Sequence, residues 1–245
     1  MRTRRGQRAS NVTKTSRRTS ASPKPSRRPR VAIQPIEREP HVKALLAFAD
    51  LARRARLRWY VFGAQAVNLH GFPRATADLD VTVELGTRSV ANLLLLLARA
   101  GFEPRFADDA FAAAARVIPA VHRGSGLPID VVLGGPGLEQ RFLDEVVLVQ
   151  LGRRRIPVLS AENLIVTKLL AGRAKDLEDV RELLAVRGED IDRAHIEQLV
   201  DLLDRALDQA DLRPLFKRLC EGASRTTTPT VQAAQVKRGP RRGSR

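Results

Sequence analysis

One stretch of the sequence, residues 61–84, constrains the fold more than any other. An apolar run ends at Gly63, and fifteen residues further on a second apolar run begins with Asp78-Leu79-Asp80-Val81. This alternation of polar and apolar residues predicts a strand over residues 79–84 with one buried face. Because side chains at positions i and i+2 of a strand share a face, Asp78 and Asp80 are expected side by side, with Cβ atoms roughly 6–7 Å apart.

Two carboxylates at this spacing predict a cation site. They repel each other by roughly 2–3 kcal/mol at an effective dielectric constant of about 20, and a bound cation reverses the sign of that energy. Oxygen ligands suit Mg²⁺ or Mn²⁺, whereas the four His and one Cys of the chain show no zinc-ligand spacing. The alternative is a turn with solvated charges. Gly63, which permits a sharp turn and the close approach of a phosphate, favours the cation site.

A third carboxylate stands alone in another apolar run. Residues 127–133 predict a short buried strand that contains Asp130 and ends at Gly134-Gly135. A buried Asp without a partner costs several kcal/mol, so something must hold this one. A cation shared with Asp78 and Asp80 would do so, and so would hydrogen bonds from the backbone or from an Arg.

A lysine interrupts the most apolar of the predicted helices. This helix begins at Ser160, a suitable N-cap, and ends at Gly172. Lys168 lies within it and is flanked by apolar residues on nearly every side. Its amine either reaches solvent along an extended side chain or meets an anion, and the break in the apolar pattern favours the anion.

The stretch from Gly63 to Asp80 resembles the signature of the DNA polymerase β-type nucleotidyltransferase superfamily. Within it, the resemblance is closest to the bacterial abortive-infection nucleotidyltransferases that act as type IV toxins, and it covers about residues 40–190. The resemblance implies an α+β fold, with a mixed sheet flanked by helices, and an NTP whose triphosphate lies at Gly63 and Ala64. It also implies two Mg²⁺ (or Mn²⁺) ions held by three carboxylates, those of Asp78, Asp80 and Asp130.

Ala64 departs from the pattern of this superfamily. Many members have Gly or Ser at this position, so a hydroxyl contact to phosphate is missing here and only backbone amides remain to make it. A weakened or altered nucleotide site is one consequence to be tested.

The resemblance also assigns roles to three charged residues that follow the acidic residues in the sequence. Lys168 would contact a nucleotide phosphate, Arg173 would assist it, and Asp176 would orient the lysine or the acceptor. Apart from the resemblance, the position of Arg74 and Thr76 just before the metal pair makes them candidates for a contact with phosphate. Ordinary structural roles stand beside these: a helix cap for Asp176, a charge near a helix C-terminus for Arg173, and loop positions for the other two.

The implied activity is the transfer of NMP from an NTP to a hydroxyl acceptor. An RNA acceptor such as a tRNA 3′ end is expected from the resemblance, and a toxin role would bring a cognate antitoxin. Three alternatives stay open: an antibiotic-type small-molecule acceptor, a protein acceptor, and a catalytically inactive module that binds nucleic acid or a partner.

The positive charge of the chain lies at its two ends. Residues 1–39 carry a net charge of +10 and residues 223–245 a net charge of +6, so that the formal +16 of the chain leaves residues 40–222 balanced. Both ends are rich in Arg, Ser, Thr and Pro, which predicts disordered tails. Basic arms of this kind bind nucleic acid without reading its sequence. The alternative is a compositional bias of a GC-rich genome or tails that only aid solubility.

The remaining composition bears on location. A single cysteine, Cys220, fits a reducing cytoplasm. No apolar run approaches eighteen residues, so membrane spanning is not expected. An Arg- and Ser-rich start also resembles an organellar transit peptide, although the amphipathic pattern is missing.

Periodicity gives a coarse order of elements and domains. Helices are expected over 40–56, 64–70 and 88–100, strands over 59–62, 79–84, 116–121 and 129–133, a hairpin over 146–159, and about four helices over 161–221. The expected domains are a basic tail (1–39), a catalytic domain (40–138), a mainly helical lobe (139–222) and a second basic tail (223–245).

Overall fold

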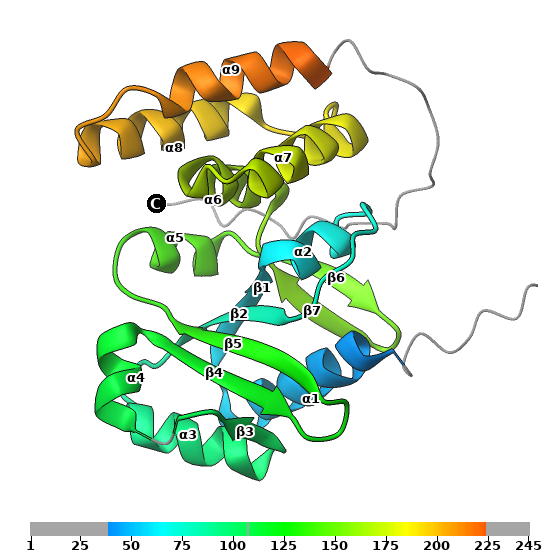
Figure 1. Cartoon of the computed structure of the whole chain (residues 1–245), viewed down its shortest axis with the longest axis vertical. Helices are drawn as coiled ribbons and strands as arrows, with labels where there is room; N and C mark the ends of the chain where they lie inside the picture. Colours follow the sequence, from blue (N-terminus) through cyan, green and yellow to red (C-terminus); the bar gives the residue numbers. More distant parts are fainter. Residues whose placement is uncertain (1–38, 107, 224–245) are drawn as a thin grey trace, which may run out of the picture. The chain divides into compact units, whose positions relative to one another are not determined.

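The structure, a computed structural model, describes residues 39–106 and 108–223 (Figure 1). The two expected tails therefore lie outside the described residues, apart from residues 39 and 223. The described part is an α+β fold with a mixed sheet and flanking helices, as expected.

Seven strands form one sheet in the order β3-β4-β5-β2-β1-β7-β6. The pairs β2–β5 and β1–β7 are parallel, and the other neighbours are antiparallel. The strands are β1 (Arg58–Phe62), β2 (Leu79–Glu84), β3 (Phe102–Pro104), β4 (Val117–His122), β5 (Leu127–Leu133), β6 (Val147–Leu151) and β7 (Arg154–Val158).

The helices of the described residues fall into two groups along the chain. The first are α1 (Pro40–Ala55), α2 (Gly63–Leu69), α3 (Val90–Arg99), α4 (Asp109–Ala115) and α5 (Leu138–Asp144). The second, which follow the last strand, are α6 (Ala161–Ala171), α7 (Ala174–Arg187), α8 (Arg193–Ala206) and α9 (Leu212–Ala223). These last four confirm the helices expected over 161–221. No helix in the described ranges has the length and apolar composition needed to cross a membrane.

The face of the sheet that packs against α1 explains the period-two pattern of β2. Leu79, Val81 and Val83 are fully buried, and α1 packs against β2 and β5 on this side. The side chains of Asp80 and Asp130 alternate with these positions and stay partly exposed. The fold therefore leaves the acidic residues on the opposite face.

Three short elements were missing from the expected order. β3 has three residues, too few for a periodic signal, and α4 and α5 each have seven. The Asp108 carboxylate caps α4 by accepting hydrogen bonds from the backbone N–H groups of Ala110 and Phe111. The hairpin of β6 and β7 was expected, and its place in the sheet comes from the parallel pairing of β7 with β1.

Candidate active site

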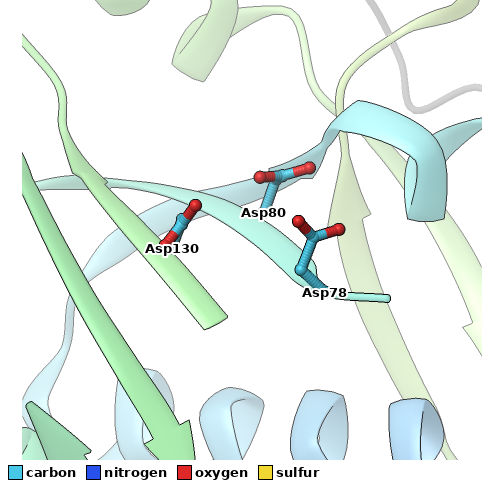
Figure 2. A group of neighbouring side chains, drawn as sticks. All are labelled: Asp78, Asp80 and Asp130. Carbon is cyan, nitrogen blue, oxygen red and sulfur yellow. The ribbon is translucent and has the colours of Figure 1, made fainter. Parts of the chain in front are cut away.

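Three carboxylates converge on the face of the sheet opposite α1. Asp80 on β2 pairs in register with Asp130 on the parallel strand β5, and Asp78 lies directly before β2. One carboxylate oxygen from each residue lies within 4.8 Å of the other two. Figure 2 shows the three side chains rising from the same side of the two strands. The structure therefore brings together the three acids that the sequence singled out.

Burial and neighbouring negative charge perturb the protonation of Asp80 and Asp130. Burial, followed by the negative charges of Asp78 and Asp130, raises the pKa of Asp80 from 3.8 to about 6, while Lys168 and Lys175 act in the opposite direction. Burial and Asp78 also raise the pKa of Asp130. At neutral pH, the carboxylates of the cluster therefore repel one another.

The donor set fits a hard divalent cation. Three carboxylates supply oxygen ligands of the kind that Mg²⁺ and Mn²⁺ prefer, and a cation among them would replace mutual repulsion by attraction. Thr76 supports this arrangement, because its hydroxyl Oγ1 donates to Oδ1 of Asp78 over 3.0 Å. The structure thus places Thr76 against a carboxylate, and a contact between Thr76 and phosphate stays a prediction.

Gly63 lies against the acidic cluster at the start of α2. Its φ angle is +67°, and a Cβ atom at this position would lie 1.9 Å from Oδ2 of Asp80. Only glycine fits here, both for its backbone angle and for the space. The sharp turn expected at Gly63 is therefore present, with Ala64 next to it in the first turn of α2.

Lys168 is buried among carboxylates. Its amine Nζ lies 2.5 Å from Oδ2 of Asp179 and 3.4 Å from Oδ1 of Asp176, and its side chain is 7% exposed. It does not extend to solvent, and the anions it meets belong to the protein. Asp176 thus contacts the lysine, while its role in orienting Lys168 or the acceptor and the contact between Lys168 and nucleotide phosphate remain predictions.

Two arginines complete this group of charges. Arg173 pairs with Asp176, and Arg74 pairs with Asp179. Burial acts to raise the pKa of Asp176, but the ion pairs with Arg173 and Lys168 outweigh it and hold the pKa below its usual value. Arg74 also donates its backbone N–H to Oδ1 of Asn68 over 2.6 Å. The loop that leads into Asp78 is therefore fastened both to α2 and to α7.

Asp179 is the residue of this group that received no role in the sequence analysis. It is 2% exposed and accepts from both Lys168 and Arg74. A signal was present, because Asp179 follows Asp176 by three residues and so shares its face of α7. Lys175, whose charge lowers the pKa of Asp80, was missed as well.

Comparisons with known proteins give distant similarities. No family model matches the sequence, and no curated protein matches it. Among solved structures, the chain is similar to LnuA, a lincosamide antibiotic adenylyltransferase with lincomycin bound, at 16% identity and a TM-score of 0.43 over 59% of this chain and 96% of that one.

Two further solved structures show similarity of the same degree. An antigenic nucleotidyltransferase-like protein from Paracoccidioides brasiliensis is 17% identical, with a TM-score of 0.46 over 71% of this chain and 91% of that one. The antibiotic-resistance factor ANT(2'')-Ia is 12% identical, with a TM-score of 0.45 over 76% of this chain and 97% of that one. Similarities this distant carry no conclusion about the activity of the present chain.

Proposed function

We propose that this chain is a metal-dependent nucleotidyltransferase that moves NMP from an NTP to a hydroxyl acceptor. The observation that carries the proposal is the convergence of the Asp78, Asp80 and Asp130 carboxylates from two parallel strands, directly beside the turn at Gly63. The resemblance of residues 63–80 to the polymerase β-type signature supports the same assignment.

In the proposed reaction, the acceptor oxygen forms a bond to the α-phosphorus of the NTP. The bond from that phosphorus to the oxygen bridging to the β-phosphorus breaks, pyrophosphate leaves with the electron pair, and the hydroxyl proton is lost to solvent. Divalent ions bound by the three carboxylates would supply charge neutralisation and a lowered pKa for the acceptor hydroxyl.

The residues of the chain supply positioning and charge. Thr76 orients the carboxylate of Asp78, and Gly63 lets the backbone approach Asp80. Lys168 is held by two carboxylates, and its positive charge already acts on Asp80. The positive charges of Lys168 and Lys175 would stabilise a triphosphate bound beside the acidic cluster. The protein forms no covalent bond to the substrate in this reaction.

The finer parts of the proposal concern the acceptor and the biological role. An RNA acceptor such as a tRNA 3′ end, and a toxin with a cognate antitoxin, rest on the resemblance stated above and on the basic ends of the sequence. The same transfer reaction would apply to a hydroxyl group of a small molecule or of a protein.

The test is transfer of label from each of four α-labelled NTPs in the presence of Mg²⁺ and total RNA. We expect incorporation by the wild type and a rate at least about 10²-fold lower for Asp80→Asn, as is typical when a principal electrostatic contributor is lost. Glu189→Gln, which removes an exposed acid, is the matched control and should retain the rate. Label found in protein or in a small molecule would identify another acceptor. No label in any product would mean a binding module and not an enzyme.

A further inference from the structure

Arg105 and Asp130 lie in one row across the sheet. Asp130 pairs with Pro119 of β4, and the backbone N–H of Arg105, just beyond β3, donates to the carbonyl of Pro119 over 2.8 Å. Two strand spacings separate the two residues, about 10 Å in all. The Arg105 guanidinium lowers the pKa of Asp130, against the raising effects of burial and of Asp78. It therefore lies within electrostatic reach of the acidic cluster.

The side chains on this face of β4 and β5 are partly exposed. Along β4 and β5, residues alternate strictly between buried and partly exposed positions, and Asp130 belongs to the partly exposed set. Its companions on this face are small and apolar: Val117, Pro119, Val121, Pro128 and Val132. A ligand bound at the acidic cluster would thus reach Arg105 across these partly exposed side chains.

Two phenylalanines shortly after Arg105 in the sequence are exposed to solvent. Phe106 and Phe111 are 54% and 51% exposed, and their ring centroids lie 5.6 Å apart with an interplanar angle of 61°. The other six Phe of the chain are buried or partly buried. Asp108 fixes the first turn of α4, and with it the position of Phe111. The two rings thus form a small exposed aromatic patch next to Arg105.

We propose that Arg105, Phe106 and Phe111 bind the single-stranded end of a nucleic-acid acceptor. A base stacks on the two rings, a backbone phosphate pairs with Arg105, and the terminal hydroxyl lies at the acidic cluster. This proposal rests on the proposed function, since the bound strand is the acceptor of the NMP.

The chemistry of the surface favours this ligand over a protein. Aromatic side chains next to an Arg are the usual combination for unpaired bases and their phosphates. A duplex would not serve, because its bases are stacked on one another. The formal charge of +16, which lies entirely in the two ends of the sequence, also favours a polyanion.

The experiment measures binding of a fluorescein-labelled single-stranded RNA to the full chain by anisotropy, without NTP, at low and high salt. Replacing both rings by leucine, Phe106→Leu with Phe111→Leu, keeps apolar area but removes stacking, so we expect affinity to fall about tenfold at both salt concentrations. The corresponding pair of tyrosine substitutions keeps stacking and should bind like the wild type. Arg105→Gln should weaken binding at low salt and reduce the salt dependence by about one phosphate contact.

Two matched controls sit elsewhere on the surface. Leu207→Ala alters a side chain that is 51% exposed, and Arg99→Gln removes an exposed cation from α3; both should leave RNA affinity unchanged. Thermal unfolding of each variant checks that the fold is kept.

The outcomes separate this proposal from the proposed function. Equal RNA affinity of the leucine pair and the wild type, or no RNA binding by the wild type, overturns the acceptor surface even where NMP transfer is observed. Leucine and tyrosine pairs that bind equally well also overturn it, because the surface would then be a generic apolar patch that fits a protein partner. Weaker binding by the leucine pair, with wild-type binding by the tyrosine pair, supports the acceptor surface. The NMP-transfer assay then tests the proposed catalytic function separately.

Discussion

Gly63 lies so close to Asp80 that a single added methyl group would overlap the carboxylate, with 1.9 Å between the new Cβ and Oδ2. Phe62 pairs in register with Asp80, so the chain turns into α2 just where the acidic residue emerges from β2. The turn at Gly63 and the carboxylate of Asp80 therefore form one structural unit.

The first prediction concerns Gly63→Ala. We expect the variant to lose at least about 10²-fold in NMP transfer, because a displacement of about 1 Å at a reacting centre has an effect of that size. The left-handed backbone angle adds a loss of about 1–2 kcal/mol in unfolding free energy. Gly86→Ala is the matched control, since Gly86 has a similar φ angle of +59° and nothing within 4 Å of a new Cβ. It should show the stability loss and keep the activity; equal activity of the two variants would contradict the role of Gly63.

The second prediction concerns pH, metal and Asp80. The pKa of Asp80 rises from 3.8 to about 6 on folding, so the folded state holds this proton more tightly than the unfolded chain does. The destabilising contribution of the ionised carboxyl therefore grows as pH rises from about 4 to about 6 and is complete above that range. Mg²⁺ competes with the proton, and its stabilising effect on thermal unfolding should be large at pH 7.5 and small at pH 5.

Asp80→Asn tests the same relation without a change of pH. In the absence of metal, this variant should be more stable than the wild type at pH 7.5 by about 1–3 kcal/mol, since it removes a charge that its surroundings disfavour. It should also lose the stabilisation by Mg²⁺ or Mn²⁺. Glu189→Gln, at an exposed position, should behave like the wild type in both respects. A metal-free Asp80→Asn variant that is less stable than the wild type would show that the acids do not repel each other.

The third prediction concerns Thr76. Its hydroxyl donates to the carboxylate of Asp78, and loss of such a supporting hydrogen bond typically lowers metal affinity about 10–100-fold. Thr76→Val keeps the shape and removes the donor, so we expect weaker binding of Mn²⁺, measured by electron paramagnetic resonance titration. Thr76→Ser retains a hydroxyl and should bind Mn²⁺ like the wild type. Equal affinities of the Val and Ser variants would assign Thr76 to the loop structure alone.

Local pattern was enough to anticipate β2 and the four helices after the last strand. In β2, each apolar residue faces the core, and the caps at Ser160 and Gly172 bound α6 as expected. β3 escaped prediction because its three residues are held by pairing with β4 and not by any periodicity of their own. Local signals are sufficient where an element is long enough to bury a face by itself.

The residues of the candidate site also differ in whether local spacing predicts that they lie close together. Asp78 and Asp80 are neighbours by strand geometry, which spacing alone predicts. Asp130 joins them only through the parallel register of β2 with β5, a tertiary pairing that spacing along the chain does not determine. Lys168 was recognised because it breaks an apolar pattern, whereas its closest partner, Asp179, lies on the next helix and is reached only through the packing of α6 against α7.

The last prediction concerns this buried pair. Asp179→Asn removes the carboxylate 2.5 Å from the amine of Lys168 and leaves a buried cation with one more distant partner, Asp176. We expect a loss of about 3 kcal/mol in unfolding free energy, measured by urea denaturation, because removing one member of a buried ion pair exposes the other to its full desolvation cost.

A neighbouring ion pair on α7 is the matched control. Glu178 pairs with Arg181 over 2.9 Å at the surface, where both side chains are at least half exposed, so Glu178→Gln should change stability by at most about 1 kcal/mol. Combining Asp179→Asn with Lys168→Met removes both charges of this pair, and we expect it to recover most of the lost stability without restoring NMP transfer. Recovery of transfer together with stability would show that Lys168 has only a structural role. Failure to recover stability would mean that the lost stability came mainly from the ion pair between Asp179 and Arg74.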